Sequence, residues 1–182
     1  MTLAFCATGA GLLLLALALR RAVPGARVAP ALLGLAGVLH LVDAAFPTDA
    51  RGVPPTTHGL IHNLAGLGIF VLLPIAMVAA GRAFRAHPAW RSFSHPTLVW
   101  GGVALVGLLV LLLSGGVDRF GAGQRFGVAT WFSWLLVLAW RVRQADSARA
   151  AGTVPVAPIP WSRRSHGGGP RRMRVPSAVG VE

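Results

Sequence analysis

The stretch LIHNLAGLGIFVLLPIAMVAA, residues 60–80, decides the fold class of this chain of 182 residues. It is almost entirely apolar, and a helix needs about 20 such residues, or roughly 17 at the short end, to cross a bilayer. A helix is required because lipid offers no hydrogen-bond partners to an open backbone. Pro74 falls inside the stretch, where a kink is tolerated if neighbouring groups take up the freed carbonyl. The stretch therefore predicts a membrane-spanning helix.

Four further segments meet the same standard, and they lie at residues 3–19, 28–46, 97–114 and 126–140. The first is interpreted as a retained helix rather than a signal peptide, because Arg20 and Arg21 follow its apolar part instead of preceding it. The sequence thus predicts an all-α fold, a polytopic transmembrane helical bundle of five predicted spans over residues 1–143. Residues 144–182 form a separate C-terminal tail.

Composition supports a membrane protein over a water-soluble one. Hydrophobic residues make up 54% of the chain and charged residues only 12%, whereas soluble domains carry about a quarter charged residues. The 17 basic residues against 5 acidic ones could suggest a nucleic-acid partner. The basic residues lie between and after the apolar runs, however, so no nucleic-acid partner is expected.

Cys6 is the single cysteine and has no partner for a disulfide or a cysteine metal site. Every basic residue is arginine, which indicates a G/C-rich bacterial genome and hence a bacterial inner membrane.

Arginine placement predicts the orientation. Only Arg51, Arg119 and Arg125 lie on one side of the predicted spans, and all other arginines lie on the opposite side or in the tail. By the positive-inside rule the N-terminus is outside and the C-terminus cytoplasmic. The tail, residues 144–182, lacks hydrophobic periodicity and is rich in proline and glycine, so we expect a disordered basic segment. It could contact anionic lipid headgroups or simply reinforce the topology.

Ionisable residues gather near the predicted outer ends of the spans, where burial without a partner is costly. His40 and Asp43 share one helix face because they are three residues apart, and His58 and His62 share another because they are four apart. The remaining members lie in the loops or at the helix ends: Asp49, Asp118, Arg119, Gln124 and Arg125. Tryptophans such as Trp131 and Trp134 are interpreted as interfacial anchors.

Three interpretations of this group stay open. His58, His62, Asp49 and Asp118 could bind zinc, because imidazole and carboxylate are competent ligands, although no HExxH-type string is present. His40 and His62 could instead be axial haem ligands between neighbouring spans. The third interpretation is a polar network that locks the helix ends, with Asp49 or Asp118 paired to Arg125 and His62, and its members are His40, Asp43, Asp49, His62, Gln124 and Arg125. Asp43 could also relay a proton or an ion.

Several short motifs together resemble the bacterial membrane family known as domain of unknown function 998. They are the paired arginines after the first span, the Phe-Pro-x-Asp element at Phe46–Asp49, the Gly-Leu-Ile-His run at Gly59–His62 and the Gly-Gln-Arg element at Gly123–Arg125. The resemblance covers residues 3–143 and implies a compact helical membrane bundle, usually of six spans, without an established activity. By this resemblance the usual first span is absent, and Asp49, His62, Gln124 and Arg125 form a shared outer cluster.

The functional prediction is a non-enzymatic structural, interaction or transporter-like bundle in the lipid bilayer, with a homo-oligomer able to supply a missing half. The alternative is a metal-dependent membrane hydrolase that acts on a lipid amide or ester. The sequence identifies no catalytic residue, and it contains no phosphate-binding loop or nucleophile elbow. Whether the protein is an enzyme therefore depends on the site.

Overall fold

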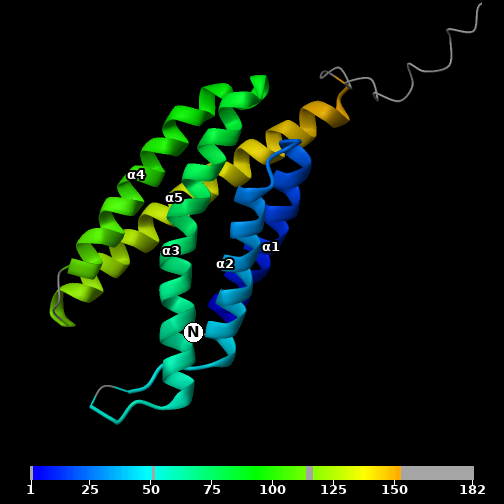
Figure 1. The fold of residues 1–182 in the computed structure, drawn as a ribbon. Coiled ribbons are helices and arrows are strands. Elements are labelled where there is room, and N and C mark those ends of the chain that lie inside the picture. The colour runs from blue at the N-terminus through cyan, green and yellow to red at the C-terminus, as the bar shows by residue number, and fades with distance from the viewer. Residues whose placement is uncertain (1, 51, 114–116, 153–182) are drawn as a thin grey trace, which may run out of the picture.

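The computed structural model describes residues 2–50, 52–113 and 117–152, and the side chains in these ranges except those of residues 117–120. All regular structure in this part of the chain is helical (Figure 1). The elements are α1 (Thr2–Ala22), α2 (Val28–Ala45), α3 (Thr57–Ala86), the short 3₁₀ helix η1 (Pro88–Trp90), α4 (Arg91–Leu113) and α5 (Val117–Ala150). The predicted all-helical fold class is confirmed.

Four helical segments are long and apolar enough to cross a membrane, which confirms the predicted multi-pass architecture. They are α1, α2, α3 and the segment Pro88–Leu113. The fifth predicted span, residues 126–140, coincides with the middle of α5, which is not among the four. Arg125 and Arg141 lie at the two ends of the apolar part of α5. They limit the length of this apolar part, because charges within a span are costly in lipid.

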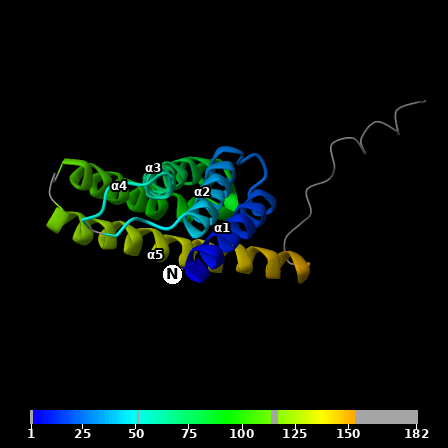
Figure 2. The ribbon, with the colours of Figure 1, turned by 90° about the horizontal axis from the view of Figure 1, so that it is seen from below.

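The helices follow one another in space in the order of the chain. α1 and α2 form an antiparallel pair, α3 packs beside α2, and α4 packs beside α3. The turn between α1 and α2 contains Gly25 with a φ of 89°, a left-handed conformation that glycine adopts without strain. Seen from below, α5 runs along one side of the other four helices and touches α4, α3 and α1 (Figure 2). α5 therefore joins the two ends of the row.

The best-packed region of the bundle lies toward the α1–α2 turn. Large side chains from four helices are almost completely enclosed there: Leu19, Leu33, Leu73, Met77, Phe84 and Trp134. Trp134 and Trp131, expected to be interfacial anchors, are instead 0% and 4% exposed. The reason is that both side chains belong to the apolar core that α5 shares with α1, α2, α3 and α4.

Close contact between α1 and α2 depends on two glycines. A Cβ atom added to Gly37 would lie 2.9 Å from the carbonyl oxygen of Gly9, and one added to Gly9 would lie 2.8 Å from that of Gly37. Backbone atoms cannot move away cheaply, so only glycine permits this approach. Small residues have the same role at many helix interfaces within membranes.

The C-terminal part of α5 corrects one expectation. The disordered tail was predicted to begin at Gln144, but α5 continues to Ala150, and residues 153–182 of the predicted tail lie outside the described residues.

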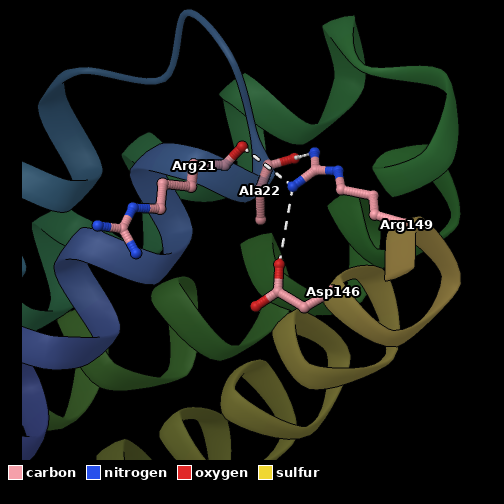
Figure 3. A network of polar contacts seen from close by, with 4 residues as sticks. All are labelled: Arg21, Ala22, Asp146 and Arg149. Carbon is pink, nitrogen blue, oxygen red and sulfur yellow. Dashed lines mark hydrogen bonds and ion pairs between the residues drawn. The ribbon is translucent and has the colours of Figure 1, made fainter. Parts of the chain in front are cut away.

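Figure 3 shows that Arg149 reaches the end of α1, where its guanidinium donates hydrogen bonds to the carbonyl oxygens of Arg21 (3.2 Å) and Ala22 (3.0 Å). Asp146 lies 3.7 Å from the same guanidinium. A cation at a helix C-terminus satisfies carbonyls that have no partner within the helix.

Replacing this arginine should loosen the contact between α5 and α1. We expect Arg149→Ala to lower the free energy of unfolding by about 1 kcal/mol, because two hydrogen bonds at a helix terminus are lost. Arg143→Ala is the matched control, since Arg143 is exposed on the same helix and forms no hydrogen bond within the described part of the chain. Thermal unfolding in detergent measures the difference, and equal midpoints for the two variants would contradict the assigned role.

Candidate functional site

A cavity of about 320 Å³ lies between α1, α2, α3 and α5, toward the end of the bundle where α2 ends and α3 begins. Its polar lining comes from Thr8, His40, Asp43, His62 and Gln124. Its apolar lining includes Phe5, Ile69, Phe70, Val128, Trp131 and Phe132. The cavity thus combines a few converging polar groups with aromatic walls, which is typical of a small-molecule site.

Asp43 is the acidic residue among the described residues that line the cavity. Its side chain is only 3% exposed, and its Oδ1 atom forms no hydrogen bond with the described protein. The nearest basic atom is Nδ1 of His62, 3.6 Å from Oδ1, which is beyond hydrogen-bond distance. A buried carboxylate without hydrogen bonds costs free energy. Oδ1 of Asp43 is therefore one of four buried side-chain atoms without a hydrogen bond among the described residues, and it is the carboxylate atom among them; the other three are His87 Nδ1, Thr97 Oγ1 and Trp134 Nε1.

The two cavity histidines are oriented by backbone carbonyls. Nδ1 of His40 lies 2.9 Å from the oxygen of Ala36, and Nδ1 of His62 lies 2.9 Å from that of Phe46. A carbonyl oxygen only accepts, so Nδ1 carries the hydrogen in both rings, and Nε2 of a neutral ring is then an acceptor. Phe5 packs against both rings, with centroids 6.2 Å from His40 and 5.9 Å from His62.

The aromatic wall was not predicted from the sequence. Phe70 of α3 and Trp131 of α5 meet edge to face with ring centroids 4.3 Å apart. Gly127 allows this contact, because a Cβ there would lie 3.0 Å from a ring atom of Phe70. No local pattern signals this pairing, since it depends on where α5 crosses α3.

Asp49 belongs to a different structure, the cap of α3. Its carboxylate accepts hydrogen bonds from the backbone N–H of Thr56 (2.9 Å) and from the Thr56 hydroxyl (2.6 Å). Thr56 in turn accepts from the N–H of Gly59 at 3.2 Å and so caps the helix. These bonds, the one from the hydroxyl above all, hold the pKa of Asp49 below its ordinary value of 3.8. A Cβ on Gly59 would collide with the Asp49 carboxylate.

The predicted polar network is therefore assembled only in part. His40, Asp43, His62 and Gln124 line one cavity, but Asp49 binds Thr56 and does not pair with Arg125 or His62. Arg125 is exposed and forms no ion pair within the described part of the chain. The structure does not form the Asp49–Arg125 pair, because Asp49 accepts hydrogen bonds from Thr56 instead, and the alternative Asp118–Arg125 pair lies outside the described side chains.

The zinc candidates are also separated. His58 packs against Phe46 with ring centroids 5.4 Å apart, while His62 faces the cavity and Asp49 caps α3. The side chain of Asp118 lies outside the described residues. Among the residues that the structure describes, no three His, Cys, Asp or Glu side chains are placed to hold one metal ion. The haem prediction for His40 and His62 stays untested.

The four long apolar helices define the class of the protein, a multi-pass helical membrane protein. The chain belongs to the family described as "Protein of unknown function (DUF998)", whose model matches residues 1–141. The resemblance inferred from the short motifs is confirmed. No curated protein and no solved structure is similar enough to the chain to count as a match.

The Asp49–Thr56 cap predicts a pH-dependent stability. We expect Thr56→Val to lower the free energy of unfolding at pH 7 by about 1 kcal/mol, because the helix cap is lost, and by the lost stabilisation of ionised Asp49 in addition. A lowered pKa stabilises the fold above the ordinary value of 3.8 and no longer does so once pH has fallen through the lowered pKa. The difference between Thr56→Val and wild type should therefore narrow below pH 3.8.

The matched control for this cap is Thr57→Val, since Thr57 is exposed and its side chain forms no hydrogen bond within the described chain. It should unfold like wild type at every pH. A constant difference between Thr56→Val and wild type from neutral to acid pH would contradict the role of Asp49.

Proposed function

We propose that the protein crosses a bacterial inner membrane five times, with the N-terminus outside and the C-terminal end of α5 in the cytoplasm. The proposal is supported by the length of α5, which runs diagonally along the other helices (Figure 1). It is also supported by the position of its C-terminal part, where Arg149 binds the end of α1 and Arg141 binds Ser92 at 3.2 Å. α5 thus returns to the arginine-rich end of the bundle, in agreement with the positive-inside rule.

The function we propose is non-enzymatic binding of a small molecule in the cavity between α1, α2, α3 and α5, in a transporter-like or interaction bundle. The observation that carries the proposal is the unsatisfied Asp43 in a cavity with aromatic walls. Ionisable groups within membrane helices commonly mark ligand or ion sites, because burying them without such a use is costly. The cavity volume of about 320 Å³ falls at the small end of ligand pockets, which span roughly 300–1,000 Å³.

A metal-dependent hydrolase of a lipid amide or ester has less support. It requires metal ligands that converge on one point together with an open coordination position for water. The candidate ligands Asp49 and His58 are engaged with Thr56 and Phe46 respectively, away from the cavity that His62 lines. Ligand binding in the cavity requires no described residue to leave its present partner, whereas a zinc site would require Asp49 and His58 to do so.

The five-span topology predicts a specific labelling pattern. In a Cys6→Ala background, single cysteines replace Pro54 in the α2–α3 loop, Pro24 in the α1–α2 turn and Ser147 near the end of α5, all of which are exposed. A membrane-impermeant maleimide applied to intact cells should label Pro54→Cys only. All three should be labelled after permeabilisation. Labelling of Ser147→Cys in intact cells would mean that α5 does not cross the membrane.

Filling the cavity should abolish ligand binding. Thr8 lines the cavity, whereas Gly11 lies one helical turn further along α1 with open space around it. We expect native mass spectrometry of the protein in lipid nanodiscs to detect a bound small molecule in wild type and Gly11→Trp, and to find it lost in Thr8→Trp. A bound mass that persists in Thr8→Trp, or its absence from wild type, would count against the proposed function.

A further inference from the structure

The polar groups of the cavity described above are mostly hydrogen-bond acceptors. Asp43 offers a carboxylate, and the hydrogen on Nδ1 of His40 and His62 is already donated to a backbone carbonyl, which leaves Nε2 of each neutral ring as an acceptor. The hydroxyl of Thr8 donates to the carbonyl oxygen of Ala4 at 2.8 Å and so offers only its lone pairs. Among the described lining residues, the groups that can donate into this space are the Gln124 amide and the indole N–H of Trp131.

The described protein supplies no cation that pairs with Asp43 by a hydrogen bond. The hydrogen of Nδ1 of His62 points to the oxygen of Phe46, at 2.9 Å, while Oδ1 of Asp43 is 3.6 Å away. Arg125 does not line the cavity and is exposed. A carboxylate buried in this way gains most from a ligand that brings both positive charge and N–H donors.

The aromatic side chains that line the cavity indicate which kind of group accompanies the positive charge of the ligand. Phe5, Phe70, Trp131 and Phe132 surround the polar groups, and the faces of aromatic rings attract cations as well as apolar groups. We infer that this cavity is a binding site for a primary ammonium group on a small apolar body, held by Asp43, His40 and His62 against the aromatic wall. The inference rests on the proposed ligand-binding function and names the chemical class of the ligand.

Other cations fit these acceptors less well. A metal ion needs its ligands within about 2.0–2.2 Å of one point, and no three such side chains converge among the described residues. A quaternary ammonium has no N–H, so it would leave the carboxylate and both Nε2 atoms without hydrogen bonds. A primary ammonium directs three N–H bonds outward and can reach acceptors on different helices.

Two sources could deliver the same group. Under the proposed topology the cavity lies toward the outer surface, where it is accessible to a free amine from outside or to the headgroup of an aminophospholipid in the outer leaflet. Both present a primary ammonium, and the experiment separates them by lipid composition.

The test uses the full chain in nanodiscs of phosphatidylcholine, which carries no primary amine. The probe is 2-phenylethylamine, and its neutral counterpart is 2-phenylethanol, which has the same apolar body. Binding is followed through the fluorescence of Trp131, with a Trp131→Phe variant to assign the signal. We expect the amine to bind at least about tenfold more tightly than the alcohol, because a charge-assisted hydrogen bond is lost with the alcohol.

Three variants make the test specific. Asp43→Asn should reduce binding of the amine to the level of the alcohol, whereas Asp49→Asn, which removes an acid outside the cavity, should leave it unchanged. Gly66→Ser keeps the charge of Asp43 but adds a hydroxyl beside it, since a Cβ at Gly66 would lie 4.0 Å from Oδ2 without a clash. Gly66→Ser should weaken binding of the amine at least severalfold. This variant serves as the test if Asp43→Asn does not fold.

A second arm replaces part of the lipid with phosphatidylethanolamine. If the lipid headgroup is the occupant, this lipid should compete with 2-phenylethylamine and remain bound to wild type, but not to Asp43→Asn, on delipidation. If a free amine is the occupant, the affinity for the probe should be the same in both lipids.

Each remaining outcome overturns the inference. Equal binding of amine and alcohol would refute an ammonium site while leaving a ligand-binding cavity in place. The ligand-binding function itself is overturned by a bound mass that persists in Thr8→Trp or is absent from wild type. Tight zinc binding that depends on Asp43 and His62 and displaces the amine would replace the ammonium with a metal. Absence of both amine binding and retained phosphatidylethanolamine would refute it for both sources.

Discussion

The constraint on which this structure depends is that lipid offers no hydrogen bonds to a polypeptide. All described regular structure is helical because a helix satisfies its own backbone. The helix ends are where carbonyl and N–H groups lack partners, and the chain meets this need with side chains: Thr56 and Asp49 at the start of α3, and Arg149 at the end of α1. The same rule makes an unsatisfied polar side chain between the helices a notable exception.

Asp43 is one such exception, beside Thr97 of α4 and Trp134 of α5, whose buried polar atoms also have no hydrogen bond within the described chain. Nδ1 of His40, Nδ1 of His62 and the Thr8 hydroxyl each have a backbone partner, and these residues line the same cavity as Asp43 and the aromatic side chains. At the opposite end the bundle is filled by large apolar side chains such as Leu73, Phe84 and Trp134. The protein is thus tightly packed at one end and contains the cavity of about 320 Å³ at the other.

Much of the fold could be predicted from the sequence, because long apolar runs have one main physical explanation. The four apolar helices were predicted within several residues, whereas α3 continues to Ala86 and α5 to Ala150. These extensions carry arginines, which can place their charged ends in water while the backbone stays helical. The shared placement of His40, Asp43 and His62 was predicted in outline because spacing along a helix fixes the face on which a side chain lies. The polar cap of Asp49 was missed, although Thr56 before a helix is a recognisable capping signal.

The sequence by itself determined that the chain is helical, that it belongs in a membrane and that its family is the one matched over residues 1–141. These properties follow from local runs and motifs, which do not depend on how the helices are arranged. The tertiary structure alone decided which polar residues meet. The path of α5 brings Trp131 and Gln124 to the cavity, and the Thr56 cap takes Asp49 away from Arg125. Such pairings depend on crossing angles and on competition between neighbouring donors, and neither is encoded in the spacing of residues along one helix.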